Sequence, residues 1–313
     1  MRYAALGVLM ALAGVAAPSP QADRLVVAAD GSGDFRRVQE AVDFVREGAL
    51  TPVTILIRRG RYEELVRVPR AKPNLRLIGE DRKEVVIAAL NNDKLNPGVS
   101  RRCVVGVEAA DTVIENLTIR NLTPYKGSQA EALTVKADRC VLRHVDFLSF
   151  QDTLNLNGRT YVEDCYVEGD VDFVWGRGPA VFDRCHLRMM HDGCVVQSRN
   201  EPDKPGFVFL DCRLTAAPEV KKFVLARIDA AKYPASQVSF VRCAMPGNIC
   251  RQAWQLDGGA ASALRFEEHA TTDEEGRPAD LSARRHGRLL DAKQATELTP
   301  DKVLAGSDGW KAR

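Results

Sequence analysis

The pattern of apolar and polar positions along the chain is one of short strands joined by turns. Residues 53–57 read Val-Thr-Ile-Leu-Ile, which is typical of a buried strand. Further short strands are expected at 60–64, 66–68, 74–79 and 85–88. Since no long helical pattern separates these strands, the sequence does not favour a doubly wound α/β sheet.

One helix is expected near the start of the chain, at residues 36–46. Apolar residues recur there with a helical period, at Val38, Ala41, Val42 and Val45. Asp34 precedes this period and is the expected N-cap. In a protein built of stacked coils, a helix in this place closes the open end of the stack. Helical or turn character returns at 292–298 and 300–304, close to the C-terminus.

A repeat is visible from residue 115 onward. Each copy is a short apolar frame that follows a polar residue, and successive copies are 20 to 31 residues apart. The first apolar position is occupied in turn by Leu117, Val145, Cys165, Cys185, Cys212 and Cys243. Unequal spacing of a constant motif indicates constant strands and variable loops. In a parallel β-helix, such positions would stack about 4.8 Å apart along one inward row.

Composition and charge narrow the class of protein. The chain has 313 residues, 45% of them hydrophobic, which suffices for one large domain with a full core. A formal net charge of +2 argues against a dedicated nucleic-acid binder. Residues 1–22 read as a signal peptide, with Arg2 at the positive end, an apolar run at 4–17 that is too short to span a membrane, and a cleavage site between Ala16 and Ala22. We therefore expect an exported protein, secreted or periplasmic, with one catalytic domain at 23–313.

Two aspartates stand out in the stretch 150–176. Asp152 follows Gln151, and Asp172 lies in the run Val-Asp-Phe-Val-Trp, which has strong β propensity. Burying an aspartate in such a run has a free-energy cost unless a partner stabilises its ionised form. The 20 residues between them correspond to one coil of the expected repeat. The two carboxylates are therefore expected side by side on adjacent coils.

The segment Gln-Asp-Thr-Leu at 151–154, followed by Gly-Asp-Val-Asp-Phe-Val-Trp-Gly at 169–176, resembles the two central signatures of the pectin methylesterases, or pectinesterases. Further blocks match in the same order, from about residue 25 to 310. The resemblance implies an all-β fold, a right-handed single-stranded parallel β-helix. It also implies an N-terminal capping helix and a C-terminal tail that packs along the coil.

The resemblance also implies the catalytic residues. Asp172 corresponds to the nucleophile, and Asp152 to the general acid that later acts as base. Arg227, in Leu-Ala-Arg-Ile-Asp, corresponds to the arginine that pairs with the nucleophile. Gln129 and Gln151 carry side-chain amides that suit an oxyanion site. No Gly-x-Ser-x-Gly elbow is present, and neither a metal nor another cofactor is implied.

Aromatic residues beside the two aspartates are expected to contact the sugar. We assign substrate binding to Phe150, Phe173 and Trp175, together with Arg227. Gln197, which resembles another block of the family, is interpreted as a structural amide facing inward. His186 and His191 are interpreted as loop residues.

The sequence departs from the family pattern at the expected sugar-binding wall. Asp229 stands where an aromatic residue would stack on the sugar, and its charge should disfavour a polyanionic substrate. Tyr233 or Trp254 is a candidate for supplying the missing face. Glu131 replaces a valine of the family's Gln-Ala-Val-Ala-Leu block. The reaction class is therefore better defined than the substrate.

The cysteines leave two alternatives. On a β-helix, Cys165 and Cys185 occupy the same position one coil apart, and the strand spacing of about 4.8 Å lies within the Cα separation that a disulfide tolerates. We expect either a Cys165–Cys185 bridge, which export favours, or a stack of buried free thiols. Cys212 and Cys243 should continue the row unbridged. No common pattern is expected for Cys103, Cys140, Cys194 and Cys250.

The sequence thus predicts an exported aspartyl esterase, a pectinesterase that acts on methyl-esterified homogalacturonan of the cell wall and releases methanol. Its partner is this pectin substrate, not nucleic acid, and it is a monomer without membrane contact after removal of the signal. Two alternatives remain. One is an esterase with the same site for a less anionic ester, and the other is a noncatalytic glycan-binding β-helix.

Overall fold

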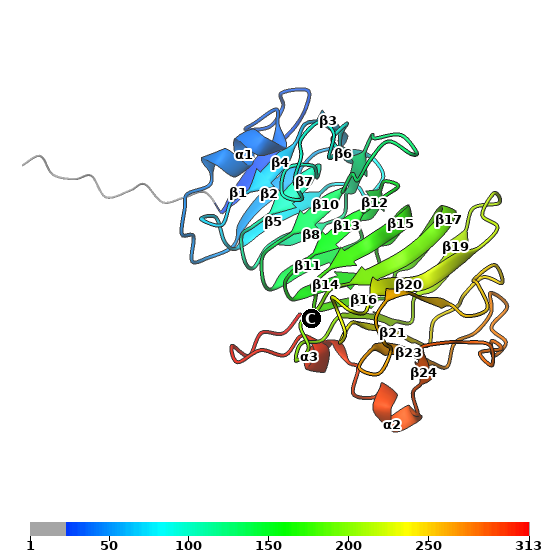
Figure 1. Cartoon of the computed structure of the whole chain (residues 1–313). Helices are drawn as coiled ribbons and strands as arrows, with labels where there is room; N and C mark the ends of the chain where they lie inside the picture. The colour runs from blue at the N-terminus through cyan, green and yellow to red at the C-terminus, as the bar shows by residue number, and fades with distance from the viewer. Residues whose placement is uncertain (1–22, 313) are drawn as a thin grey trace, which may run out of the picture.

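The computed structural model describes residues 23–312, so the expected signal peptide at 1–22 lies outside the described residues. From Arg24 onward the chain winds into successive coils of short parallel strands (Figure 1). Each complete coil contributes one strand to each of three faces, and the strands of one face pair in register from coil to coil. The predicted right-handed parallel β-helix is confirmed.

Within the described residues, the first face is a sheet of 11 parallel strands. In spatial order these are β1 (Arg24–Val27), β2 (Val53–Ile57), β5 (Leu75–Gly79), β8 (Val113–Glu115), β11 (Cys140–Arg143), β14 (Thr160–Glu163), β16 (Ala180–Asp183), β18 (Phe207–Leu210), β21 (Gln237–Val241), β23 (Arg265–His269) and β24 (Arg288–Leu289).

The other two faces are joined by two long strands that bend from one face to the next, β15 (Tyr166–Gly176) and β17 (His186–Ser198). The second face consists of β3 (Gly60–Glu63), β6 (Val85–Ala89), β9 (Thr118–Asn121), β12 (Asp146–Leu148), the first halves of β15 and β17, and β19 (Arg213–Ala216). The third face consists of β4 (Val66–Val68), β7 (Val105–Val107), β10 (Leu133–Val135), β13 (Leu154–Leu156), the second halves of β15 and β17, β20 (Phe223–Asp229) and β22 (Trp254–Gly258).

The turn from the first face to the second explains the sequence repeat. In each copy the polar residue adopts a left-handed backbone conformation, with φ between 49° and 59°, at the corner where the chain passes from one face to the next. These residues are Asn116, His144, Asp164, Arg184, Asp211 and Arg242. The apolar residue that follows each of them is buried, as the repeat predicts.

Four cysteines of this inward row are stacked as free thiols. All eight cysteines are unpaired, so the favoured Cys165–Cys185 bridge is wrong and the alternative holds. Each thiol is aimed at two backbone carbonyls, as Cys185 Sγ is at Val162 O (3.4 Å) and Asp183 O (3.5 Å). Because Cys165, Cys212 and Cys243 repeat this arrangement, the sulfurs satisfy weak hydrogen bonds to the backbone and remain separate thiols.

The interior is filled by rows of side chains that stack from coil to coil. Phe209 lies between Phe182 and Phe240, with ring centroids 4.7 and 4.5 Å away. All three rings are fully buried. The register of adjacent strands places identical residue types on top of one another, which gives stacked aromatic pairs in addition to the burial of apolar area.

Helix α1 (Val38–Phe44) closes the N-terminal end of the stack (Figure 1). The expected N-cap is wrong, because the residue in that position is Arg37 and its side chain makes no capping hydrogen bond. Glu64 instead accepts hydrogen bonds from the backbone N–H groups of Val38 (2.8 Å) and Gln39 (3.0 Å). Asp34 accepts a hydrogen bond from Val26 N at 2.8 Å. A carboxylate from the next coil therefore satisfies the helix terminus.

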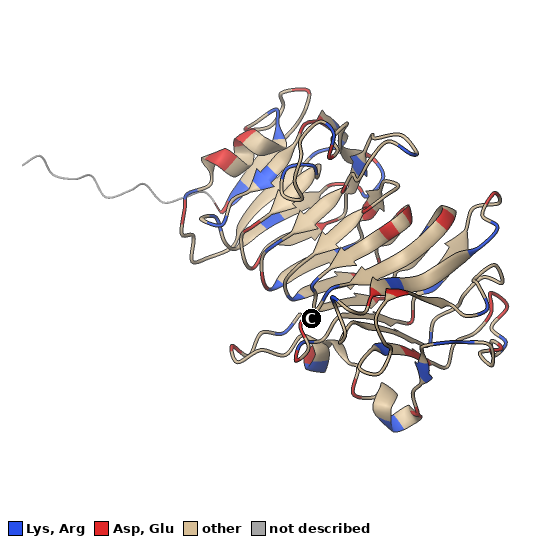
Figure 2. Cartoon of the chain, in the orientation of Figure 1, with Lys and Arg blue, Asp and Glu red and all other residues tan. Residues whose placement is uncertain are grey.

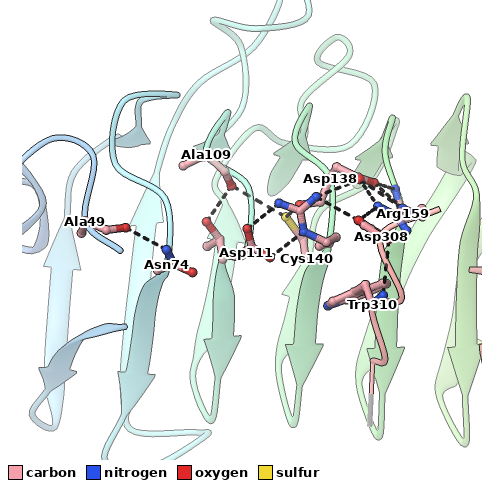
Figure 3. Close-up of polar contacts among 11 residues, drawn as sticks. Ala49, Asn74, Ala109, Asp111, Asp138, Cys140, Arg159, Asp308 and Trp310 are labelled. Atoms are coloured by element: carbon pink, nitrogen blue, oxygen red, sulfur yellow. Dashed lines mark hydrogen bonds and ion pairs between the residues drawn. The ribbon is translucent and has the colours of Figure 1, made fainter. Parts of the chain in front are cut away.

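The C-terminal tail packs on the outside of the first face, as expected. It contains two single-turn helices, α2 (Ala292–Ala295) and α3 (Pro300–Val303), whose apolar side chains cover an outward apolar row. Asp308 accepts hydrogen bonds from Arg159 Nη1 (2.8 Å) and Arg139 Nη1 (3.2 Å) (Figure 3). The Trp310 ring lies 5.6 Å from the Arg159 guanidinium. These contacts fix the tail to two consecutive coils, and Arg139 links them to a third by pairing with Asp111.

Charged residues of both signs are spread along the whole coil (Figure 2). Within residues 23–312, no helix has the length and apolar character needed to cross a membrane.

Candidate active site

The two aspartates singled out by the sequence are neighbours on adjacent coils of the third face. The backbone N–H of Asp152 donates a hydrogen bond to Val171 O at 3.0 Å, directly before Asp172. Both aspartates have left-handed backbones, with φ of 68° and 50°. The pairing of β15 with β17 shifts register on both sides of Val171, so that Asp172 lies in a β-bulge. Aspartate tolerates this conformation better than most residues, and bulges of this kind re-aim side chains next to active sites.

Asp172 is held by a cation and an amide. Arg227 donates two hydrogen bonds to it, from Nε to Oδ1 (2.8 Å) and from Nη2 to Oδ2 (2.6 Å). Gln197 Nε2 donates a third, to Oδ2, at 3.0 Å. The ion pair with Asp172 raises the pKa of Arg227. Three donors on one carboxylate fix its plane, which is what a nucleophilic carboxylate requires.

Asp152 is buried in a different environment. Arg102 Nη2 donates a hydrogen bond to Asp152 Oδ2 at 2.7 Å. The same guanidinium makes three hydrogen bonds to Glu131, at 2.7 to 3.0 Å, and one to Asp93 at 3.1 Å. Burial raises the pKa of Asp152 well above its usual value, and the charges of Glu131 and Asp172 raise it further against the opposing effect of Arg102. A carboxyl group with a raised pKa can hold a proton at neutral pH.

The two candidate amides lie next to each other beside these carboxylates. Gln129 and Gln151 are on adjacent coils, since Ala130 N donates a hydrogen bond to Gln151 O at 3.1 Å. Both side chains are half-buried, and Gln151 directly precedes Asp152. The amides therefore come from the coils that also contribute Glu131 and Asp152.

An aromatic wall stands on one side of the site. Phe150 packs against Tyr125 and His191, with centroid distances of 5.7 and 5.5 Å. Tyr125 is exposed and stacks on His191 at 3.5 Å. Trp175 lies close to two guanidinium groups, 4.7 Å from that of Arg199 and 5.7 Å from that of Arg102. Its indole Nε1 is buried and has no hydrogen-bond partner among the described residues.

The chain is similar to known proteins in both sequence and fold. The model of the family described as Pectinesterase matches residues 24–307. The chain belongs to the pectinesterase family. It is 36% identical over 203 residues to Pectinesterase 31 of Arabidopsis thaliana, covering 60% of this chain and 64% of that protein. It is 31% identical over 241 residues to Probable pectinesterase 56 of the same plant, covering 74% of this chain and 84% of that protein.

Solved structures of the family have the same fold. The pectin methylesterase from carrot superposes with a TM-score of 0.82 and is 26% identical, covering 93% of this chain and 96% of the carrot chain. The pectin methylesterase PemA from Erwinia chrysanthemi superposes with a TM-score of 0.79 over 94% of this chain and 99% of its own, at 24% identity. The second likeness shows the fold alone.

Two expectations for the sugar-binding wall of this family member are wrong. Phe173 is fully buried in the hydrophobic core, because the bulge at Asp172 turns it inward, and it cannot line a groove. Trp254 is also buried, stacked on Phe266 at 4.9 Å, and supplies no sugar platform. Tyr233 is half-buried, and its ring lies 5.9 Å from the Arg199 guanidinium, so it remains a candidate.

Three polar residues also differ from expectation. Gln197 does not face inward, because it is half-buried and bound to Asp172. His186 and His191 are not loop residues, since both belong to β17. β17 continues through the bulge because it pairs with neighbouring strands, and local turn propensity does not predict this pairing.

Asp229 has a structural role at the end of β20. Its Oδ1 accepts hydrogen bonds from the backbone N–H groups of Ala231 (3.1 Å) and Lys232 (3.4 Å). Its Oδ2 forms an ion pair with Lys232 Nζ at 3.0 Å, and the hydrogen bond from Lys232 lowers the pKa of Asp229. The charge expected to repel a polyanion is therefore matched by a neighbouring lysine.

Arg102 and Arg199 were not among the site residues predicted from the sequence. A signal for Arg102 was present in Glu131, since a carboxylate inside the apolar run Gln-Ala-Glu-Ala-Leu requires a buried cation nearby. Arg199 directly follows β17, two positions after Gln197, and alternate residues of an extended chain lie on the same face. The sequence could therefore have placed Arg199 on the same face as Gln197. It could not have identified Arg102 as the partner of Glu131.

Proposed function

We propose that this member of the pectinesterase family hydrolyses methyl esters of homogalacturonan to methanol and a free carboxylate. The observation that carries the proposal is the pair of unlike carboxylates. Asp172 is fixed by Arg227 and Gln197, whereas the neighbouring Asp152 is buried and its pKa is raised. Two carboxyl groups whose environments differ in this way suit a nucleophile and a general acid.

In the first half of the reaction, an oxygen of Asp172 attacks the ester carbonyl carbon. The developing oxyanion accepts hydrogen bonds from the side-chain amides of Gln129 and Gln151. The bond from carbon to the methoxy oxygen then breaks, and Asp152 gives its proton to that oxygen. Methanol leaves, and the substrate acyl group remains bound to Asp172 as an anhydride.

In the second half, water attacks the acyl carbon, and the ionised Asp152 takes one of its protons. The bond to Asp172 breaks, which releases the uronate and restores the Asp172 carboxylate. Arg227 holds Asp172 in place before and after the reaction. The sum is ester plus water giving acid plus methanol, so Asp152 is protonated again at the end.

Basic hollows on both sides of the site support an acidic polymer as substrate. Thr134, Asn155, Trp175 and Gln197 form one outward row across adjacent strands. At one end of this row lies a hollow of about 250 Å³, whose lining includes Arg67, Lys136 and one carboxylate, Glu108. Near the other end lies a hollow of about 290 Å³, in which Arg177, Arg199 and Lys232 outnumber one carboxylate, Glu201, the ion-pair partner of Arg177. A chain of uronates that crosses the row would meet cations at both ends.

The location and assembly of the protein are part of the proposal. We infer export to the periplasm or the cell exterior, where pectin is accessible, from the sequence of residues 1–22. The domain 23–313 acts as a monomer, without nucleic acid or a membrane as partner.

Methanol release from highly methylated pectin, compared with release from small uncharged methyl esters, tests the substrate class. The proposal predicts a higher kcat/KM on pectin, with rates that fall as salt screens the basic hollows. Equal or higher kcat/KM on the uncharged esters would favour the alternative of a less anionic substrate. Absence of hydrolysis of every methyl ester, together with tight glycan binding, would favour the noncatalytic alternative.

A further inference from the structure

Arg102 and Glu131 form a buried ion pair that is in direct contact with the proposed acid. The Arg102 side chain is 9% exposed, that of Glu131 is 0% exposed and that of Asp152 is 10% exposed. Arg102 comes from the loop between β6 and β7. Asn91 Nδ2 holds this loop by donating to Arg101 O and Cys103 O, both at 2.8 Å. The guanidinium is thus placed by fixed backbone.

The groups in direct contact are two deeply buried carboxyl groups and one cation, Arg102. At longer range, the charge of Asp172 raises the pKa of Asp152 and that of Arg199 lowers it. Asp93 also contacts Arg102, but its side chain is 39% exposed and its charge is screened by water. Ionisation of both Glu131 and Asp152 would have a high free-energy cost, because one guanidinium would face two buried negative charges. One proton is therefore shared between two unequal sites.

The hydrogen bonds decide which site holds the proton. Glu131 accepts three from Arg102, whereas Asp152 accepts one, at Oδ2. The bidentate arrangement stabilises the ionised form of Glu131 more than that of Asp152. The proton is left to Asp152, and because Oδ2 faces Arg102, the proton is carried by Oδ1.

We propose that Arg102 and Glu131 act as a positioning pair for Asp152, in which Arg102 fixes Oδ2 and Glu131 cancels the charge of Arg102 so that Oδ1 keeps its proton. The proposal rests on the role of Asp152 in the proposed function. Arg102 alone would hold Asp152 ionised and so remove the acid. Glu131 alone would be an unpaired buried charge. The two residues are needed together.

The directions of the pKa shifts agree with this assignment. Burial raises the pKa of Glu131, and Arg102 opposes that rise. The pKa of Asp152 is raised well above its usual value, with burial as the main cause and Glu131 as the next. An acid catalyst must be protonated, so the rate falls as the pH rises through the pKa of Asp152.

Glu131→Gln tests the pair, because it removes the negative charge and leaves a side chain of similar size. Arg102 would then be unopposed and would lower the pKa of Asp152. We expect the alkaline limb of the kcat/KM profile for methanol release to move to lower pH by about one unit or more. On that limb the rate would fall about tenfold, since each unit changes the protonated fraction about tenfold. KM should change little, because neither residue is expected to contact the sugar.

Two further variants separate this effect from loss of structure. Glu268→Gln breaks another buried pair, with Arg284, in which the side chains are 2% and 12% exposed and the N–O distance is 2.9 Å. We expect it to lower stability without moving the pH profile. The double variant Arg102→Met with Glu131→Val removes both charges at once. Its alkaline limb should lie at or above the wild-type pH.

The outcomes are distinct. A folded Glu131→Gln variant whose alkaline limb coincides with that of the wild type overturns the positioning role, as does a shift of equal size in Glu268→Gln. If Glu131→Gln fails to fold, the double variant decides, and an alkaline limb below the wild-type pH overturns the proposal. A wild-type protein that releases no methanol from any ester instead refutes the proposed function on which the pair depends.

Discussion

Replacement of Arg227 by methionine would test the structural basis of the proposed nucleophile. Arg227 holds Asp172 by two charge-assisted hydrogen bonds of 2.8 and 2.6 Å. Methionine keeps the length of the aliphatic part and removes both donors. Gln197 would remain as a single donor to Asp172. The carboxylate would then be free to rotate away from the attack position.

The size of the effect follows from burial. Removal of one partner of a fully buried ion pair costs about 3–5 kcal/mol. Asp172 is 9% exposed and Arg227 is 32% exposed in their side chains, so water would partly replace the lost donors. We therefore expect a loss of about 2 kcal/mol in the free energy of unfolding. Misplacement of the nucleophile by about 1 Å should lower kcat about 100-fold.

The chain offers a matched control in Arg242, which binds Asp211 through the same pair of donor atoms, at 2.7 and 2.6 Å. That pair is on the surface, with side chains 50% and 44% exposed. Arg242→Met should change the free energy of unfolding by less than about 1 kcal/mol and leave methanol release unchanged. Both variants are compared by urea unfolding and by methanol release from methylated pectin.

Two results would refute this reasoning. If Arg227→Met retained the wild-type rate with an intact fold, Asp172 would not depend on Arg227 for its position. If Arg242→Met were as destabilising as Arg227→Met, burial would not determine the strength of these pairs. In the first case the assignment of Asp172 as nucleophile would lose its main structural support.

Two other predictions concern the subsite wall and the cysteines. Asp229→Asn keeps the oxygen that accepts hydrogen bonds from Ala231 N and Lys232 N but removes the negative charge. The ratio of activity on pectin to activity on a small methyl ester should therefore rise. An unchanged ratio would mean that Asp229 does not contact the polymer. Thiol titration of the denatured, unreduced protein should find eight free thiols, and six would indicate the Cys165–Cys185 bridge that the structure lacks.

The fold was predictable because each coil that carries the sequence repeat uses the same corner and the same inward apolar position. A polar residue that accepts a left-handed turn, followed by an inward apolar residue, recurs in each copy of the frame and marks the corner between two faces. The strand at 53–57 was predicted to the residue for the same reason, since its alternation reflects burial. The cap of α1 was not predictable, because Glu64 reaches the helix from the next coil.

The site was predictable only in part. The motifs gave Asp152, Asp172 and Arg227, and the expected ion pair between the last two is present. The direction of Phe173 was misjudged because the bulge at Asp172 shifts the alternation of the strand. Arg102 was not predicted because it lies in a loop far from Asp152 in sequence. No local sequence pattern indicates that these two residues are in contact.

Methanol release from highly methylated pectin by the wild type and by Asp172→Asn, measured side by side, tests the central claim most directly. Asparagine has nearly the shape of aspartate but is a poor nucleophile. The mechanism predicts rapid release by the wild type and a loss of about three orders of magnitude or more in kcat for the folded variant. Release by Asp172→Asn at a rate near that of the wild type would contradict a covalent role for Asp172.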